Sequence, residues 1–313
     1  MHRLSNLVLL ILIAVTASSQ TGDQATFRAD ARLVPLHATV VDKNGKLVSN
    51  LPREAFKVFE NDVEQQIKLF RREDVPVSLG LVIDNSGSMR DKRKKVEAAA
   101  IQLVKESNRE DEVFIVNFND DAFLDVPFTN DIKKLEEGLA RIDSRGGTAM
   151  RDAISMSIDW AKDKGKKDKK VLLVITDGDD NTSGVTLEKL VEKAQQSEVL
   201  IYAIGILSQE EHREAKRAER ALKALTQASG GVTFLPKELE EVERLASQVA
   251  HDIRNQYTIT YTPLNQVLDG SYRRIRVVAN GPNRPTVRTR TGYYANAGAG
   301  KKATVSQAAP AKP

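Results

Sequence analysis

The feature that most constrains the fold is a set of four continuous apolar runs. They span residues 77–83 (VSLGLVI), 113–118 (VFIVNF), 171–175 (VLLVI) and 199–206 (VLIYAIGI). Unbroken apolar runs of this length are typical of strands buried on both faces of a parallel sheet. Segments with helical periodicity alternate with them, at residues 91–107, 131–141, 149–164, 186–197, 210–229 and 238–256. We therefore predict an α/β domain with a doubly wound, mostly parallel sheet over residues 76–256.

Strand-like segments flank this domain on both sides. The candidates before it are residues 32–41, 56–60 and 66–70, and those after it are residues 257–261, 273–278 and 286–291. Neither group alone would bury enough surface to be stable. We therefore predict that residues 27–75 and 257–295 combine into one small β-sandwich, with the α/β domain inserted between its two halves.

The two ends of the chain have compositions of their own. His2 and Arg3 precede an apolar run from Leu7 to Ala17, and small residues follow. This order is typical of a secretory signal peptide, which we assign to residues 1–19, and the run is short for a bilayer span. We expect an exported protein, periplasmic or secreted, without stable membrane insertion after cleavage; an uncleaved N-terminal anchor is the alternative. Residues 296–313 have low complexity and are expected to form a disordered tail.

The composition excludes several kinds of chemistry. The 313 residues include no cysteine and four histidines, which rules out disulfides, thiolate metal sites and thiol nucleophiles. The net charge is only +4, and basic runs such as residues 92–95 are interleaved with acidic residues, so we interpret them as solvated faces and not as nucleic-acid contacts. The remaining chemistry must use hydroxyls, carboxylates or surface recognition.

Carboxylate and hydroxyl side chains stand directly after two of the predicted strands. Asp84, Ser86 and Ser88 follow the first apolar run, Asp177 follows the third, and Thr148 comes between them after a pair of glycines. Ligands of an open parallel sheet bind outside the carboxyl ends of its strands, so we expect these five side chains to converge. Such an all-oxygen set suits Mg²⁺, or else Mn²⁺ or Ca²⁺, and not zinc or copper.

The pattern Asp84-x-Ser86-x-Ser88, with Thr148 and Asp177-Gly178, resembles the metal-ion-dependent adhesion site of the von Willebrand factor A domain family. The order of helices and strands over residues 76–256 is similar as well, and the flanks resemble those of bacterial exported members. The resemblance implies that the three hydroxyls bind the metal, and that the two aspartates act directly or through water. It also implies a binding function, in which an acidic side chain of a partner protein completes the coordination.

The loops around this site are expected to form a rim that contacts the partner. The residues assigned to the rim are Asn85, Asp120, Asp121, Asp179 and Asp180. Because acidic rim residues would repel a purely acidic surface, we expect a partner with a single carboxylate flanked by basic groups.

Three other interpretations compete with this one. A magnesium-dependent hydrolase could use Asp84 and Asp177 beside the metal to activate water, but we find no histidine or lysine in the three site loops to act as a base. A structural scaffold would use the metal for stability alone. Finally, Ser86 and Ser88 could simply cap the following helix. We predict a binding module that is not an enzyme.

Overall fold

The predicted apolar runs lie side by side in one sheet. The computed structural model describes residues 32–72, 74–140, 144–207, 212–296 and 301–302. Its central sheet has the strand order β10-β9-β8-β5-β6-β7, and every pairing is parallel except that of β7 with β6. The bounds are β5 (Val77–Asp84), β6 (Glu112–Phe118), β7 (Ala122–Thr129), β8 (Lys169–Thr176), β9 (Leu200–Gly205) and β10 (Thr233–Phe234). The mostly parallel α/β sheet is therefore confirmed.

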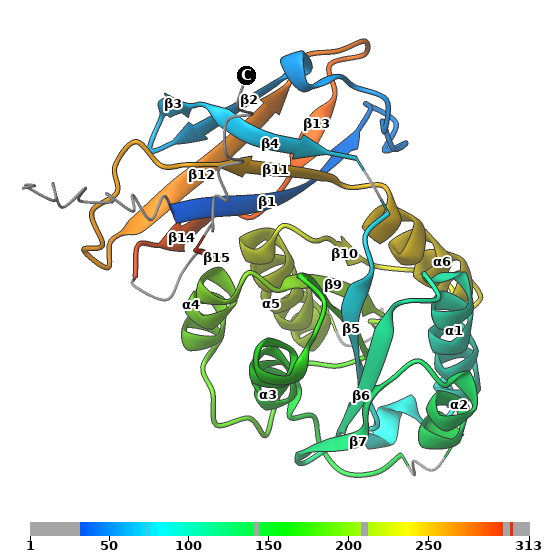
Figure 1. The fold of residues 1–313 in the computed structure, drawn as a ribbon. Coiled ribbons are helices and arrows are strands. Elements are labelled where there is room, and N and C mark those ends of the chain that lie inside the picture. The colour runs from blue at the N-terminus through cyan, green and yellow to red at the C-terminus, as the bar shows by residue number, and fades with distance from the viewer. Residues whose placement is uncertain (1–31, 73, 141–143, 208–211, 297–300, 303–313) are drawn as a thin grey trace, which may run out of the picture. The chain divides into compact units, whose positions relative to one another are not determined.

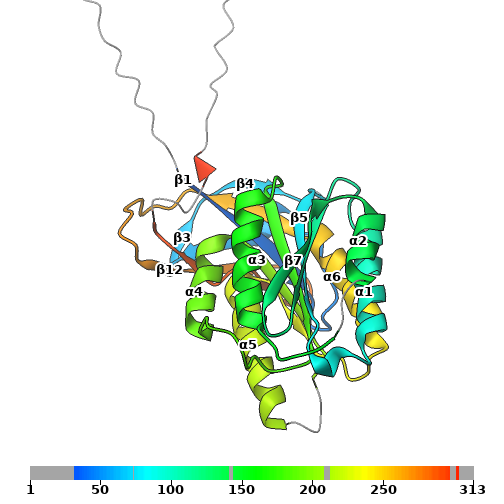
Figure 2. The same ribbon diagram turned by 90° about the horizontal axis from the view of Figure 1, so that it is seen from below.

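Helices cover both faces of this sheet, as Figure 2 shows. Their bounds are α1 (Arg93–Glu106), α2 (Ile132–Ala140), α3 (Met150–Lys164), α4 (Leu187–Ser197), α5 (His212–Ser229) and α6 (Glu241–Arg254). Apolar side chains of α1, α2 and α6 pack on one face, and those of α3, α4 and α5 pack on the other. Every residue of β5 is buried, which explains why its sequence is apolar without alternation.

The edge strand β7 was not predicted. Its sequence, AFLDVPFT, is interrupted by Asp125 and Pro127, and the ring of Phe123 is half exposed. Proline lacks a backbone donor and is tolerated on edge strands, where one side needs no partner. β7 follows β6 through a tight turn and runs antiparallel to it, so no helix separates the two strands as the alternating pattern would require.

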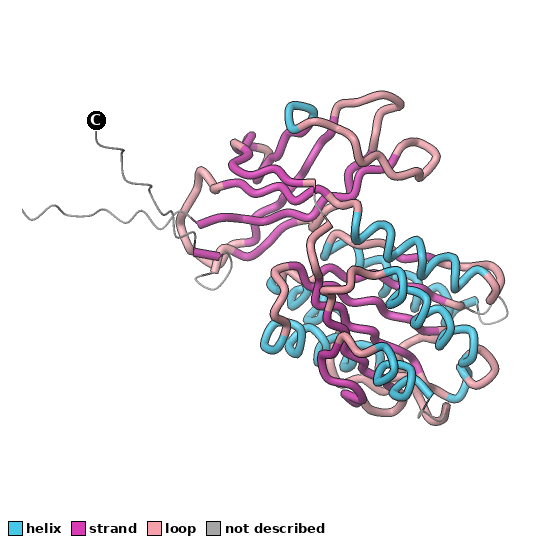
Figure 3. Tube along the Cα trace, turned by 45° about the vertical axis from the view of Figure 1, so that its right-hand side comes forward, coloured by secondary structure: helices cyan, strands magenta, loops and turns pink. Residues whose placement is uncertain are grey.

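Two antiparallel sheets combine strands from both ends of the chain (Figure 1). One has the order β13-β1-β11-β4, with β15 beside β1, and the other has the order β14-β12-β2-β3. The bounds are β1 (Arg32–Val41), β2 (Phe56–Glu60), β3 (Val63–Gln65), β4 (Ile67–Arg71), β11 (Tyr257–Tyr261), β12 (Tyr272–Ala279), β13 (Thr286–Arg288), β14 (Gly292–Tyr294) and β15 (Lys301–Lys302). The sheets share one apolar core. The predicted insertion of the α/β part into a sandwich is confirmed, and Figure 3 shows the α-helices gathered around the parallel sheet.

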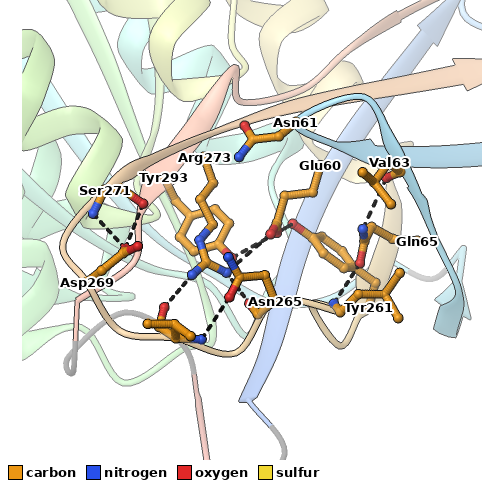
Figure 4. Close-up of polar contacts among 12 residues, drawn as sticks. Glu60, Asn61, Val63, Gln65, Tyr261, Asn265, Asp269, Ser271, Arg273 and Tyr293 are labelled. Atoms are coloured by element: carbon orange, nitrogen blue, oxygen red, sulfur yellow. Dashed lines mark hydrogen bonds and ion pairs between the residues drawn. The ribbon is translucent and has the colours of Figure 1, made fainter.

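A buried polar network ties the two antiparallel sheets together (Figure 4). The Glu60 carboxylate accepts hydrogen bonds from the hydroxyls of Tyr261 at 2.7 Å and Tyr293 at 2.9 Å, and it pairs with the Arg273 guanidinium at 3.2 Å. Arg273 is 2% exposed and also donates to the carbonyl of Asn265. A charge this deeply buried persists only when it is paired and hydrogen-bonded, so these side chains fix the pairing of distant segments.

Contacts also join the antiparallel sheets to the α/β part, within the one compact unit that follows residue 30. Gln256 donates to the hydroxyls of Thr39 at 2.9 Å and Tyr202 at 3.1 Å, and Arg288 pairs with Asp252 at 2.9 Å. The predicted signal peptide lies outside the described residues, as does most of the predicted tail. Among the helices that are described, none combines the length and apolarity needed to cross a bilayer.

Candidate metal centre

The candidate site lies where the strand order of the parallel sheet reverses. β5 lies between β6 and β8, and the chain leaves it first toward β6 and later returns on its other side as β8. Asp84 is the last residue of β5, and Asp177 directly follows β8. In open α/β sheets, the crevice outside the carboxyl ends of the strands at such a point is the usual place for a ligand.

A continuous chain of hydrogen bonds links four of the five predicted ligands. The Asp84 carboxylate accepts from the Thr176 hydroxyl at 2.5 Å and from the Ser86 backbone N–H at 2.8 Å. The Ser86 and Ser88 hydroxyl oxygens are 3.1 Å apart, and Ser88 donates to the Asp177 carboxylate at 2.8 Å. Ser86 precedes a short 3-10 helix, η2 (Gly87–Met89), but makes no capping bond with its side chain. The capping interpretation is therefore wrong for Ser86.

The fifth predicted ligand, Thr148, is held in place by its backbone. Its N–H donates to the Asn181 side-chain oxygen at 2.9 Å, and its own side chain is buried. The Thr148 hydroxyl lies 3.7 Å from the point where a β-carbon on Gly178 would stand, which places it beside the loop that carries Asp177. The two loops therefore bring the Thr148 hydroxyl and the Asp177 carboxylate to the same edge of the sheet.

The glycine pair before Thr148 is required by close packing. Gly146 has a φ of +75°, and a β-carbon there would come within 2.1 Å of the Asp120 carboxylate. The next N–H, of Gly147, donates to that carboxylate at 2.7 Å. Only glycine adopts such a φ readily and leaves room for Asp120, so the pair allows the loop to close over the strand ends.

Lys92 is a site residue that the sequence analysis missed. It lies immediately before α1, and its ammonium group forms an ion pair with the Asp177 carboxylate. The Asp177 side chain is fully buried, whereas that of Lys92 is 27% exposed. The expectation that no lysine belongs to the site loops was therefore wrong. The basic run at residues 92–95 gave no local sign that its first member turns inward.

Burial also sets the electrostatics of the site. The Asp84 side chain is almost completely buried, which raises the pKa of its carboxyl to about 6. The hydrogen bonds from Thr176 and Ser86 act in the opposite direction, and the negative charge of Asp177 adds to the rise. A dication beside both carboxylates would favour their ionised forms.

The donor set fits a hard cation. The candidate ligands offer two carboxylates and three hydroxyls, and they include no imidazole or thiol. Within the described part of the chain, no three histidine, aspartate or glutamate side chains gather as a metal-binding group. Mg²⁺ requires few carboxylates and keeps water ligands, and zinc sites instead use imidazole or thiolate.

The predicted rim residues differ in where they point. Asn85 is buried, and its side-chain amide donates to the side-chain oxygen of Asn117 at 2.7 Å, so it presents no surface to a partner. Asp120 and Asp121 are exposed.

The other two rim aspartates are paired with arginines. Asp179 pairs with Arg217 at 2.5 Å, and Asp180 pairs with Arg151 at 2.8 Å. Arg151 lies in the first turn of α3, whereas Arg217 comes from α5. These arginines partly cancel the acidity that the sequence alone attributes to the rim.

A family model matches part of the α/β domain. Residues 79–179 match the family model of the von Willebrand factor type A domain. No curated protein matches the chain.

Among solved structures, the chain is similar to the BatB protein of Bacteroides thetaiotaomicron (18% identity, covering 56% of this chain and 98% of BatB, TM-score 0.47). It is similar to a von Willebrand factor type A protein of Catenulispora acidiphila (12% identity, 85% and 75% coverage, TM-score 0.48). It is also similar to the corresponding domain of Mfa5, a type V pili tip protein of Porphyromonas gingivalis (14% identity, 57% and 97% coverage, TM-score 0.46). The family match therefore assigns residues 79–179 to a von Willebrand factor type A domain.

Proposed function

We propose that the chain is a metal-dependent protein-binding module. Asp84, Ser86, Ser88, Thr148 and Asp177 would hold a divalent cation, Mg²⁺ in the first instance and Mn²⁺ or Ca²⁺ as alternatives. The observation that carries the proposal is the unbroken hydrogen-bond chain from the Asp84 carboxylate to the Asp177 carboxylate through two serines. Hydroxyl and carboxylate oxygens so placed are the ligands that hard cations prefer.

The charge of the site favours an acidic partner group. Two carboxylates only balance the formal charge of a dication, and the metal can still attract a further carboxylate. The pairing of Asp179 and Asp180 with arginines reduces the repulsion that such a group would meet on approach. Arg217 is 51% exposed and could itself contact an acid. We therefore propose that the partner protein supplies one aspartate or glutamate side chain to the metal.

A magnesium titration of the wild type and the Asp84→Ala variant tests the metal site. Ligand at 100 times its Kd stabilises a protein by about 2.7 kcal/mol, so Mg²⁺ should raise the Tm of the wild type. The variant should lose this response, and Asp121→Ala, which removes an exposed carboxylate outside the hydrogen-bond chain, should keep it. Equal responses of the wild type and Asp84→Ala would refute the metal site.

A second experiment separates binding from the other interpretations. Immobilised wild type and Asp84→Ala are exposed to exported proteins in Mg²⁺ or in EDTA, and the bound protein is identified and its acidic residues are substituted. We expect the partner protein to be retained only by the wild type and only in Mg²⁺. Substitution of one carboxylate of the partner should abolish its retention. If EDTA lowers the Tm but leaves retention unchanged, the metal is only a structural support. Magnesium-dependent phosphoester hydrolysis lost in Asp84→Ala would instead indicate an enzyme.

We also propose that the protein works outside the cytoplasm. The basis is the signal-like segment at residues 1–19, so N-terminal sequencing of the exported protein should begin at Gln20. A membrane-bound product that still carries residue 1 would show that the segment is an anchor.

A further inference from the structure

A second candidate site lies at the opposite edge of the parallel sheet. A cavity of about 560 Å³ is lined by residues at the beginnings of the parallel strands, among them Pro76, Lys169 and Leu200. These strands end at the metal centre, so the cavity and the metal centre are at opposite ends of β5 and β8. The other wall is the face of β1, β4 and β11 that points away from the sandwich core. Volumes of this size are typical of small-molecule sites, which often form between structural layers.

The walls of the cavity are largely aliphatic. Leu33 and Leu69 line it from the antiparallel sheet, and Leu200 lines it from the parallel sheet. Leu69 is 38% exposed although it lies within a strand. An apolar occupant would cover this surface and gain the free energy of removing it from water.

The charged residues of the cavity are predominantly basic. Arg71, Lys166, Lys167, Lys169 and Arg290 line it, against two acidic residues, Asp168 and Glu198. Glu198 is already engaged, because its carboxylate lies 3.7 Å from the Arg290 guanidinium. The excess of positive charge favours an anionic group on the occupant.

Arg290 has an unused hydrogen-bond donor. The residue is 8% exposed, and one terminal nitrogen donates to the Pro35 carbonyl at 3.0 Å. Its Nε, by contrast, is buried and makes no hydrogen bond with any residue that the structure describes. A buried N–H without a partner costs free energy, so the guanidinium of this lining residue is not fully satisfied by the described protein atoms.

Lys169 adds a second buried cationic group. It is 3% exposed and donates to the carbonyl of Ile253. Burial lowers the pKa of its ammonium group to about 7, against the opposing effects of Asp74 and Asp111. An anion in the cavity would stabilise the charged form of Lys169 and be stabilised by it.

We propose that this cavity binds a small organic anion with an aliphatic body, of the kind represented by a medium-chain carboxylate. The carboxylate would lie near Arg290 and Lys169, and the chain would cover the three leucines. This inference does not depend on the metal site.

Calorimetric titration with decanoate tests the proposal, with decyltrimethylammonium as a probe of equal chain length and opposite charge. We expect the wild type to bind decanoate and not the cation. Arg71→Glu reverses an exposed charge on the cavity wall and should weaken decanoate binding about tenfold. Lys68→Glu, the same charge change on the same strand but outside the lining, should have no effect. Leu69→Asp should abolish binding, and the Tm of each variant shows that it is folded.

The proposal would be overturned by no binding of decanoate, by equal binding of the cation, or by no difference between Arg71→Glu and Lys68→Glu. Tighter binding of an apolar peptide through its C-terminal carboxylate would also overturn it, since the occupant would then be a protein segment. Asp84→Ala should bind decanoate as the wild type does, with or without EDTA, so failure of the metal site and failure of this site are told apart.

Discussion

Replacement of Lys92 by methionine removes a cationic group that already contacts a proposed metal ligand, Asp177. The change removes the ammonium group from the buried Asp177 carboxylate and keeps most of the aliphatic side chain. Exposed ion pairs contribute about 0.2–1 kcal/mol, whereas loss of one partner of a buried pair costs about 3–5 kcal/mol. With one partner buried and the other 27% exposed, we expect an intermediate cost of about 1–3 kcal/mol.

The substitution should therefore lower the stability of the metal-free protein and raise its affinity for Mg²⁺. In EDTA, Lys92→Met leaves Asp177 without its cation, so the Tm should fall by roughly 2–4 °C for each kcal/mol lost. In Mg²⁺, the dication no longer competes with the Lys92 ammonium group for Asp177. The affinity of the variant for Mg²⁺ should therefore exceed that of the wild type by about 5–150-fold. Differential scanning fluorimetry and calorimetry measure both effects. The matched control is Lys94→Met, which changes an exposed lysine in the first turn of α1 and should alter neither the Tm nor the Mg²⁺ affinity.

Unchanged or weaker Mg²⁺ binding by Lys92→Met, with Lys94→Met like the wild type, would refute this reasoning. It would mean that the metal does not bind where Lys92 meets Asp177.

Three further predictions concern stability. Burial holds the pKa of Lys169 near 7, below its value in the unfolded chain. Unfolding therefore takes up a proton between about pH 7 and 10. The free energy of unfolding should rise with pH in this range, by at most about 1.4 kcal/mol per pH unit. Lys169→Met should flatten this rise in denaturant titrations, and an equally steep rise in the variant would contradict the assignment. Arg273→Met should cost about 3–5 kcal/mol in urea unfolding because it strands the Glu60 carboxylate in the sandwich core; a loss below 1 kcal/mol would show that the network is dispensable. Gly80→Ala should cost about 1–3 kcal/mol, since its β-carbon would come within 2.4 Å of the Phe114 ring; an unchanged Tm would mean that the ring moves aside freely.

Much of the fold could be predicted because its signals are local. The continuous apolar runs of β5, β6, β8 and β9 reflect strands buried on both faces, and the helix positions follow from periodicity to within three residues. β7 could not be predicted in this way. Its alternation is broken by Asp125 and Pro127, and it is a strand because it pairs with β6, a contact that no local pattern records.

The candidate site also has features that the sequence shows and features that it does not show. Asp84, Ser86 and Ser88 lie at and just after the end of β5, and their spacing is visible in the sequence. The end of β8 then indicates where Asp177 would lie, and the glycine pair indicates the loop of Thr148. The inward turn of Asn85, the ion pair of Lys92 with Asp177, and the pairing of Asp179 with Arg217 are not visible there.

The local pattern of residues was sufficient for the parallel strands, the helices and the oxygen-rich loops, because each follows from periodicity, turn residues and spacing over a few positions. The nested sandwich followed from the composition of the two flanks together, since neither could bury enough surface alone. The tertiary structure alone decided which charges meet and where the cavity opens. Asp177 and Lys92 are 85 positions apart, and Arg290 and Pro35 are 255 apart. Charge pairing depends on distances of a few ångströms in space, and over such separations in sequence only the packing of the whole chain sets those distances.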